Sequence, residues 1–302
     1  MLKIFTLLFL SISLIQCQTK TTQYVNPFIG TANGGNTFPG AVVPWGMVSI
    51  SPHNSPGSPS GYIYGEKYFY GFGNNHLSGT GCADLGSIII TATKNNSEFI
   101  PESYRSPYSN EKAEPGYYSL FLDEVKLKGE VTATTRSSFI KFSSDSLISA
   151  HILFDVGRSL NLIGGGSINI VSHNEIEGSN ISGGFCGEDN RQNLYFVAQF
   201  NQSFSSAKIW SGNNLISQTY SSAADSSIGG IFDFYILPDD PLLIKIGISY
   251  ASIKNARQNL EIEIPDWNFE GVRNESLFQW EKNLSRILIE TENNEDKIKL
   301  SC

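Results

Sequence analysis

The chain has 302 residues, of which 40% are hydrophobic and 17% charged, and its formal net charge is −8. This composition is typical of a globular protein with a sizeable core and argues against an intrinsically disordered chain. No cluster of Lys or Arg is present to neutralise phosphates, which argues against nucleic acid as a partner.

The first element along the chain has the features of an export signal. A basic residue precedes an apolar stretch at residues 4–15, which is too short to anchor the chain in a bilayer. Leu14 lies three residues before Cys17, as in bacterial lipoprotein signals, although Gln16 is bulkier than the residue usual at that position. We expect residues 1–17 to be a signal peptide and Cys17 to be lipidated, with ordinary secretion as the alternative. Either way the mature chain is expected to be exported, as a periplasmic, outer-membrane-anchored or secreted protein.

The cysteine count limits the cross-links that the exported chain can form. If Cys17 carries a lipid, then Cys82, Cys186 and Cys302 remain, and at most one disulfide can form among them. The sequence does not show which two of these three cysteines are bonded. No C-x-x-C motif and no Cys/His cluster is present, which argues against a zinc site.

From about residue 86 to residue 252 the hydrophobic pattern has a period of two. Val125 and Leu127, for example, alternate with Lys126 and Lys128, as expected for half-buried antiparallel strands. Clusters of Gly, Asn, Asp and Ser separate the apolar runs and indicate turns. The predicted fold class is therefore all-β, with a large antiparallel sandwich over residues 18–252.

The character of the sequence changes after residue 252, where a short helical segment is expected over residues 253–302. Pro265 precedes a candidate N-cap, Asn268, and an apolar stripe follows at intervals of three or four residues. This stripe consists of Leu277, Trp280, Leu284 and Ile287. Either the edge of the sandwich or a domain that begins beyond this segment is expected to cover the stripe. If it is uncovered, the stripe is an adhesive patch, and we predict self-association of the chain.

Three segments between residues 24 and 93 carry a family resemblance: YVNPFIGTANGGNTFPGAVVPWGMVSISPHN, SGYIY and GFGNNHLSGTGCADLGSIIITAT. Together they resemble the amino-terminal domain of glycoside hydrolase family 92, the calcium-dependent exo-acting α-mannosidases. The likeness continues through AEPGYYSLFLDE, VTATTRSSFIKF, HILFDVG and LLIKIGISYASIKNARQNLE to WNFEGVRNESLFQWEKNLSRI. It therefore covers nearly all of the mature chain.

The resemblance implies a β-supersandwich, a helical linker and then an (α/α)6 barrel, of which residues 253–302 would be the linker and the truncated start. In such enzymes the catalytic acid, the catalytic base and most calcium ligands come from the barrel. No catalytic residue is therefore assigned here. Calcium is expected for the complete enzyme and not on this chain, which is expected to be inactive alone. The implied partners are mannose-containing glycans and a carboxy-terminal barrel, in cis or as a separate chain.

Inverting hydrolysis of a glycoside requires two carboxyl groups roughly 6.5–9.5 Å apart, with one protonated and one ionised. The carboxylates that we considered are Asp84, Glu188 and Asp189, which lie beside glycines or small residues. Such residues are usually turn or cap residues, and we interpret them so.

The segment NNHLSGTGC is the strongest candidate for sugar binding. His76, Ser78 and Thr80 offer donors and acceptors that sugar hydroxyls can use, while Gly79 and Gly81 permit a close approach of the ligand. The alternative is that His76 is buried and hydrogen-bonded at a domain interface.

Two further segments supply candidate substrate-binding residues. Asn36 belongs to the glycine-rich stretch GTANGGNTFPGA, whose alternative role is a set of tight turns at the domain interface. Tyr62 in SGYIY matches a loop that faces the pocket in the family, although this chain lacks the Trp and Cys that often precede that loop. Phe38 and Trp45 could stack on a sugar, but aromatic residues flanked by Pro and Val usually belong to the core.

Three functions stay open at this point. The first is the amino-terminal, carbohydrate-binding part of a secreted α-mannosidase, and the alternative is a stand-alone mannose- or glycan-binding module. The third, a mutarotase-like or lyase-like enzyme, rests on fold analogy and needs a histidine and a carboxylate in one cleft. We predict structural roles for the remaining histidines, His53, His151 and His173.

Overall fold

A computed structural model describes the chain at residues 20–95, 97, 99–162, 164–216, 220–223 and 227–302. The expected signal peptide at residues 1–17, with Cys17, lies outside the described residues. Within the part that is described, no helix is long and apolar enough to cross a membrane.

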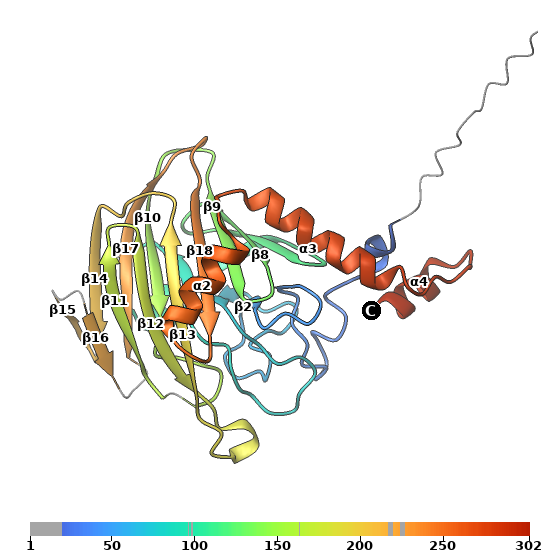
Figure 1. Cartoon of the computed structure of the whole chain (residues 1–302), viewed down its shortest axis with the longest axis horizontal. Coiled ribbons are helices and arrows are strands. Elements are labelled where there is room, and N and C mark those ends of the chain that lie inside the picture. Colours follow the sequence, from blue (N-terminus) through green and yellow to red (C-terminus); the bar gives the residue numbers. More distant parts are fainter. Residues whose placement is uncertain (1–19, 96, 98, 163, 217–219, 224–226) are drawn as a thin grey trace, which may run out of the picture.

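Two large antiparallel sheets make up most of the described chain (Figure 1). The eight-stranded sheet has the strand order β1 (Ala41–Val42), β2 (Ser49–His53), β4 (Gly71–Gly73), β5 (Ile89–Thr93), β10 (Ile148–Asp155), β17 (Ile228–Ile236), β14 (Ser206–Ser211) and β15 (Asn214–Ile216). The ten-stranded sheet has the order β16 (Tyr220–Ala223), β11 (Gly166–Ser172), β12 (Glu175–Ser182), β13 (Gln192–Phe200), β18 (Leu242–Ser249), β9 (Ser137–Ser143), β8 (Leu127–Ala133), β7 (Tyr117–Leu122), β6 (Ser106–Glu114) and β3 (Tyr68–Phe69). The predicted all-β sandwich is confirmed.

The helices are short and the longest lie at the C-terminal end of the sequence. They are η1 (Thr21–Tyr24), α1 (Pro101–Tyr104), η2 (Phe185–Gly187), α2 (Ile253–Glu263), α3 (Phe269–Leu284) and α4 (Asn294–Ser301). The predicted N-cap of α3 is confirmed, because the Asn268 side chain accepts a hydrogen bond from the amide of Gly271. The predicted short helical segment after the sandwich is confirmed as well.

The core lies between the two sheets and is rich in aromatic side chains. Phe154 of β10 meets Phe200 of β13 with ring centroids 5.8 Å apart, and Phe72 of β4 meets Tyr118 of β7 at 6.1 Å. All four residues are fully buried. Since burying one such side chain is worth roughly 1.5–3 kcal/mol, these cross-sheet contacts hold the sandwich together.

Helix α2 covers the outer face of the ten-stranded sheet (Figure 1). Its buried residues Ala256 and Leu260 pack against Phe139 and Val197 of the sheet in a second apolar cluster. Gly247 of β18 lies directly under the helix, and a Cβ at this position would overlap the Ala256 carbonyl and the Leu260 side chain. A glycine is therefore required for the helix to lie this close to the strand.

Helix α3 is fixed to the sandwich by polar and stacking contacts. The Arg273 guanidinium lies 3.7 Å over the Tyr117 ring and donates to Glu114 at 2.9 Å. The Trp280 indole donates to the Val42 carbonyl at 2.6 Å. Next to Trp280, the Glu281 carboxylate accepts hydrogen bonds from Thr21 and Thr22 of the N-terminal segment.

This docking covers much of the stripe whose cover the sequence left open. Leu277, Trp280 and Leu284 are half-buried against the sandwich, whereas Ile287, beyond the helix, is 65% exposed. Of the two covers that the sequence left open, the sandwich edge is the one found for the helical residues, where Val42 and the turn between β6 and β7 lie beside α3. Self-association of the chain stays a prediction.

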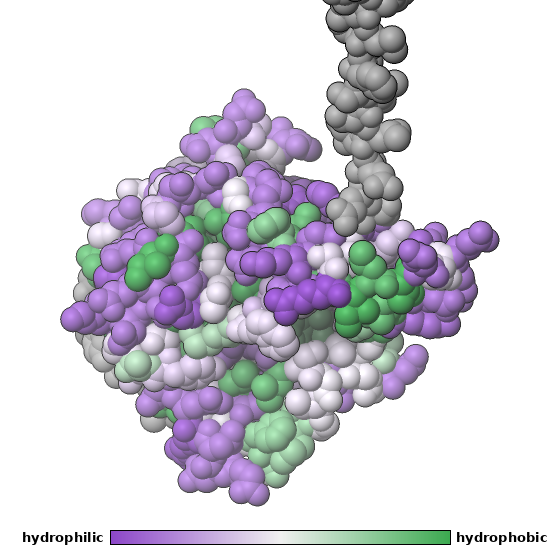
Figure 2. All heavy atoms as spheres, turned by 45° about the vertical axis from the view of Figure 1, so that its right-hand side comes forward, coloured by the Kyte–Doolittle hydropathy of each residue, from purple (hydrophilic) through white to green (hydrophobic). Residues whose placement is uncertain are grey.

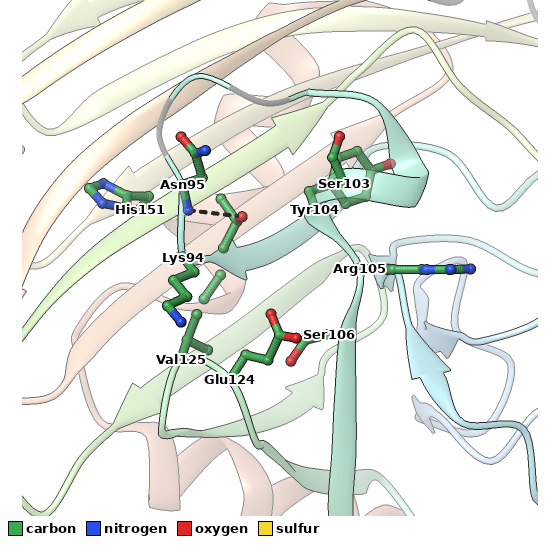
Figure 3. Close-up of a pocket in the computed structure, with 11 residues that line it drawn as sticks. Lys94, Asn95, Ser103, Tyr104, Arg105, Ser106, Glu124, Val125 and His151 are labelled. Atoms are coloured by element: carbon green, nitrogen blue, oxygen red, sulfur yellow. Dashed lines mark hydrogen bonds between the residues drawn. The ribbon is translucent and has the colours of Figure 1, made fainter.

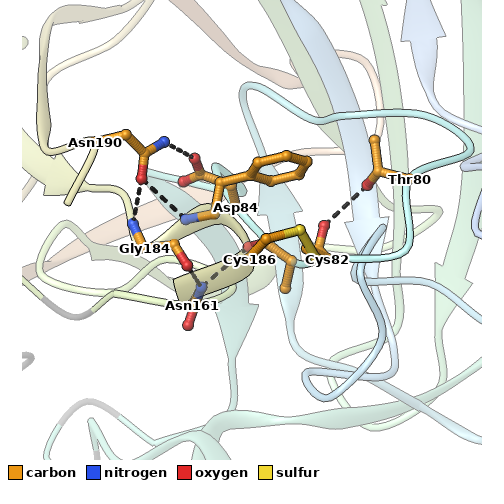
Figure 4. Close-up of a disulfide and its surroundings, with 9 residues drawn as sticks. Thr80, Cys82, Asp84, Asn161, Gly184, Cys186 and Asn190 are labelled. Atoms are coloured by element: carbon orange, nitrogen blue, oxygen red, sulfur yellow. Dashed lines mark hydrogen bonds between the residues drawn. A yellow bond between two sulfur atoms is a disulfide. The ribbon is translucent and has the colours of Figure 1, made fainter. Parts of the chain in front are cut away.

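A disulfide joins Cys82 and Cys186, which lie in two different loops and are 104 residues apart in the sequence (Figure 4). Cys302 is free and exposed. The pair that the sequence left open is thus resolved. Hydrogen bonds reinforce this link, because Asn190 donates to the Asp84 carboxylate at 2.9 Å and Asn161 donates to the carbonyls of Ala83 and Gly184.

The first prediction concerns this disulfide. Replacing both Cys82 and Cys186 with Ser should lower the free energy of unfolding by about 2–5 kcal/mol, because a closed loop of this length restricts the unfolded chain strongly. Denaturant unfolding measures the change, and Cys302→Ser is the matched control that should leave stability unchanged. A double variant as stable as the parent would contradict the prediction.

The second prediction tests the docking of α3. Gly116, in the turn between β6 and β7, has φ +77°, and a Cβ there would overlap the hydroxyl of buried Ser276 on α3. Gly65 has a similar φ of +90° but open space around it. Both Gly→Ala changes carry backbone strain of roughly 1–2 kcal/mol, and Gly116→Ala should cost a further 1–3 kcal/mol or so from overpacking. Equal losses in denaturant unfolding would show that α3 does not pack on this turn.

Candidate functional site

Residues 77–84, which we call the 77–84 loop, leave the sandwich between β4 and β5. The loop is closed at its base, because His76 and Leu85 form an isolated antiparallel bridge and the amide of Gly86 donates to the Asn75 carbonyl at 2.7 Å. The Asn75 side chain accepts from the amide of Ser87 at 2.8 Å. The glycine- and hydroxyl-rich motif of the sequence is therefore held as a loop with fixed ends.

A buried pair of imidazoles lies at the base of this loop. The Nε2 atoms of His53 and His76 are 2.7 Å apart, and His76 Nδ1 lies 2.7 Å from the Ser49 carbonyl. A carbonyl can only accept, so His76 carries its proton on Nδ1, and its Nε2 accepts from the protonated Nε2 of His53. Both nitrogens of His76 are thus used within the protein. This geometry favours the buried, hydrogen-bonded alternative for His76 over direct contact with a sugar.

Burial keeps both rings neutral. His53 is 2% exposed and His76 is 8% exposed. Burial lowers the pKa of His53 well below its ordinary value, and the neighbouring His76 lowers it further. Burial also lowers the pKa of His76 to about 4, although the hydrogen bond to Ser49 opposes the shift. Sequence reasoning missed this pairing, because the two histidines are 23 residues apart.

Ser78, Thr80 and Asn36 are brought close together. Ser78 is exposed and Thr80 is half-buried, with its hydroxyl donating to the Cys82 carbonyl at 2.9 Å. Between them, the amide of Gly79 donates to the Asn36 carbonyl at 2.8 Å. The loop that contains Asn36 therefore supports the 77–84 loop through its backbone, and the hydroxyl of Ser78 stays accessible.

Tyr62 lies elsewhere and is buried. Its phenol donates to Glu111 at 2.7 Å, and the same carboxylate oxygen accepts from Tyr118 at 2.5 Å. Burial, followed by the charge of Glu111, raises the pKa of Tyr62 well above its ordinary value. Burial also raises the pKa of Glu111, against the effect of the two phenol donors. The hydroxyl of Tyr62 is therefore engaged in a network that the sequence did not reveal.

Two cavities flank these loops. One, of about 400 Å³, is lined by Asn36 and Tyr62 together with Asn33 and Ser58. The other, of about 420 Å³, is more apolar and is lined by residues from the N-terminal segment, the loops and the C-terminal helices, including Phe38, Ser78, Trp280 and Leu284. The structure thus separates the candidate residues into two neighbouring pockets, with Asn36 and Tyr62 at the first and Ser78 at the second.

The carboxylates near the loops serve structural roles. Asp84 is 3% exposed, and its oxygens accept from the amide of Leu85 and the side chains of Asn190 and Gln192. Glu188 and Asp189 are exposed turn residues, as expected. Among the described residues no group of three or more His, Cys, Asp or Glu side chains could hold a metal ion. No carboxylate-based calcium site is therefore assigned, and calcium in the complete enzyme stays a prediction.

Trp45 is the aromatic residue that sequence reasoning placed wrongly. We interpreted it as core, yet it is 93% exposed and has φ +65° in the turn between β1 and β2. Positive φ is costly for a bulky residue, so the surrounding turn, which includes Pro44 and Gly46, has to stabilise this backbone conformation of Trp45. Phe38, in contrast, is half-buried with its ring centroid 5.2 Å from that of His76.

A further pocket of about 430 Å³ lies at the end of β5, between this strand, α1 and the turn that joins β7 and β8 (Figure 3). Exposed Lys94 and Glu124 line it, and His151 lies at its border with the ring turned away from both (Figure 3). His151 Nδ1 bonds Asp233 at 2.7 Å on the neighbouring strand. This histidine does meet a carboxylate, but Asp233 also accepts a hydrogen bond from Ser206 of the next strand, and the His151 ring is turned away from Lys94 and Glu124 (Figure 3), which disfavours a mutarotase-like or lyase-like site.

Comparison with solved structures finds two proteins with a similar fold. A family GH92 α-mannosidase from Bacteroides thetaiotaomicron is similar with a TM-score of 0.85 and 27% identity, over 94% of this chain and 40% of that chain. A family GH92 inverting mannosidase from the same bacterium has the same fold, with a TM-score of 0.79 and 24% identity over 94% and 39% of the two chains.

A curated relative, an uncharacterized secreted glycosidase from Arthroderma benhamiae, is 24% identical over 316 residues, which cover 91% of this chain and 39% of the relative. The chain thus spans about two fifths of the length of these proteins. A family model for the glycosyl hydrolase family 92 N-terminal domain matches residues 24–249, and one for the catalytic domain of that family matches residues 255–300. Since the first match alone covers most of the residues of this chain, the chain belongs to glycosyl hydrolase family 92.

Proposed function

We propose that this chain is the N-terminal, carbohydrate-binding part of an exported, glycan-degrading α-mannosidase. The observation that carries the proposal is the 77–84 loop, which is fixed at its ends and presents the exposed Ser78 beside an apolar cavity lined by Phe38 and Trp280. Sugars are recognised by such a combination of an apolar surface and a few fixed polar groups. The fold and the family membership support mannose as the sugar.

Catalysis in this proposal belongs to a C-terminal (α/α)6 barrel, which would supply the acid, the base and the calcium ligands for inversion. Buried Asp84 of the 77–84 loop and half-buried Glu111 of β6 are both engaged in hydrogen bonds within the sandwich. They are therefore poorly suited to activate water or protonate a leaving group. The chain contributes walls of the pocket and no catalytic residue.

The barrel would dock on the face around the C-terminal helices. Ile287, Leu288 and Leu300 are exposed there, and Figure 2 shows hydrophobic side chains gathered on this side of the molecule. Such a concentration of exposed apolar residues is typical of a surface that another domain covers. Export is supported by the secreted relative, and a lipid on Cys17 remains our proposal for the anchor.

The third prediction concerns sugar binding, measured by titration calorimetry of the chain with mannan and methyl α-mannoside. Ser78→Ala should weaken binding about fivefold, through loss of roughly 1 kcal/mol from one hydrogen bond. Trp45→Ala should weaken binding by a similar factor if the exposed indole stacks on the glycan. The matched controls are Ser146→Ala and Tyr235→Ala, an exposed serine and an exposed tyrosine on other parts of the surface. Absence of binding, or variants equal to the parent, would count against the proposal.

The fourth prediction concerns activity and separates an enzyme part from a stand-alone binding module. The purified chain should release no mannose from an α-mannoside in the presence of calcium, because no acid and base pair is assigned in it. Adding a family 92 catalytic barrel as a separate chain should restore hydrolysis if the chain is part of an enzyme. Binding that persists while no barrel restores turnover would favour the module. Turnover by the chain alone that a chelator abolishes would overturn the inactivity.

A further inference from the structure

We propose that His53 and His76 are positioning residues for the 77–84 loop, and that a proton taken up by either imidazole releases the loop. The inference rests on the proposed function in one respect, namely that this loop contacts the sugar. Its structural part, a pair of neutral imidazoles that fixes a loop, stands on the hydrogen bonds described above.

The first argument is that His76 joins the loop to the sandwich through two bonds to one residue. Its backbone amide donates to the hydroxyl of Ser49 at 2.7 Å, and its ring Nδ1 donates to the Ser49 carbonyl at 2.7 Å. Its backbone also bridges to Leu85, at the other end of the loop. The position of His76 therefore sets both ends of the loop relative to β2.

The second argument is that an added proton either breaks these contacts or buries a charge. With the Nδ1 proton of His76 committed to Ser49, its Nε2 must accept from His53. A proton added to His53 would keep this hydrogen bond but leave a buried charge, whereas a proton added to His76 Nε2 would set two N–H groups against each other at a separation of 2.7 Å. Neither group then has an acceptor, and two adjacent positive or donor groups in a buried place are strongly disfavoured.

The third argument is that the rings have no space in which to turn. A Cβ at Gly73 would lie 2.6 Å from His53 Nε2, one at Gly61 would lie 2.9 Å from the His53 ring, and one at Gly86 also 2.9 Å. Gly73 precedes the loop and Gly86 follows it. A displaced His53 ring would therefore push on both ends of the loop, so that relief of the contact requires the loop to move.

Among the residues that the structure describes, no charged side chain is found in contact with the imidazole pair. The side chains packed around the pair are Phe38, Leu160 and Ser49, which do not titrate, and the pKa of His53 is shifted by burial and His76 alone. Asp84, within the loop, is committed to hydrogen bonds at the other end. Tyr250, on the far side of Asn75, accepts a hydrogen bond from that residue.

The direction of the pH dependence follows from the lowered pKa values. In the opened loop each histidine regains an ordinary pKa near 6.5, whereas in the closed loop the pKa of His76 is about 4. The closed loop is therefore favoured fully above about pH 6.5, and each ring weakens it by up to about tenfold per pH unit as the pH falls toward 4. The disulfide still holds the tip of the loop at Cys82.

The fifth prediction is tested by hydrogen exchange of the amides at residues 77–84 in the full chain, expressed as protection factors at pH 6.5 and 5.5. Protection in the parent should fall roughly five- to thirtyfold over this interval. In His53→Gln, whose side-chain amide can still donate to His76 but cannot gain a proton, the fall should be at most about fivefold. His173→Gln, at an exposed histidine, is the matched control and should behave as the parent. Protection that does not change with pH in the parent would overturn the proposal.

Two further measurements keep the test decisive. If His53→Gln does not fold, ring nitrogen chemical shifts of the parent report the tautomer directly, and a His76 ring without a proton on Nδ1 at pH 7 would overturn the proposal. Mannoside affinity at pH 7 and 5.5 should fall in parallel with protection. A chain that binds no mannoside at any pH would sink the proposed function, while the exchange measurement would still decide whether the histidine pair holds the loop.

Discussion

The apolar interior shared by the two sheets is the constraint on which the other features depend. Aromatic contacts across the interior, such as that of Phe154 with Phe200, fix the separation of the sheets. Within each sheet the antiparallel pairing satisfies the backbone polar groups. The segments that join the ends of strands are therefore not needed to form the core. The 77–84 loop and the turn around Trp45 are such segments, and they can take irregular, costly conformations because the sandwich supports them.

Much of the fold could be predicted from the sequence, since it follows from local patterns. Alternation such as that of Val125, Lys126 and Leu127 identifies a strand because successive side chains point to opposite faces. The N-cap Asn268 marks the start of α3 by a contact within three residues. The order of strands in the two sheets was not predictable, because it depends on pairings between distant segments. The sequence left open what covers the apolar stripe of α3 for the same reason: the partner of Trp280 is Val42, far away in the sequence.

The sequence predicted several residues of the candidate site but not the hydrogen bonds that connect them to distant residues. The motif around His76 indicated polar groups suited to sugars, but its partner His53 lies on β2, which neighbours β4 only through the sheet order. Likewise Tyr62 was expected to face a ligand, and Glu111 on β6 takes its hydroxyl instead. Three cysteines allowed three pairs, and only the folded loops select one. Family membership adds the surrounding architecture, while the roles of single residues come from these contacts.

The exposed Trp45 gives the chain an optical property of its own. The other three tryptophans are shielded: Trp210 is buried, and Trp267 and Trp280 are half-buried against the sandwich. Indole emission shifts to longer wavelengths in water, so the red edge of the fluorescence spectrum arises mainly from one position. A domain or ligand that covers the turn between β1 and β2 would move this component to the blue and protect it from a dissolved quencher. The molecule thus contains an intrinsic reporter for the occupancy of that face.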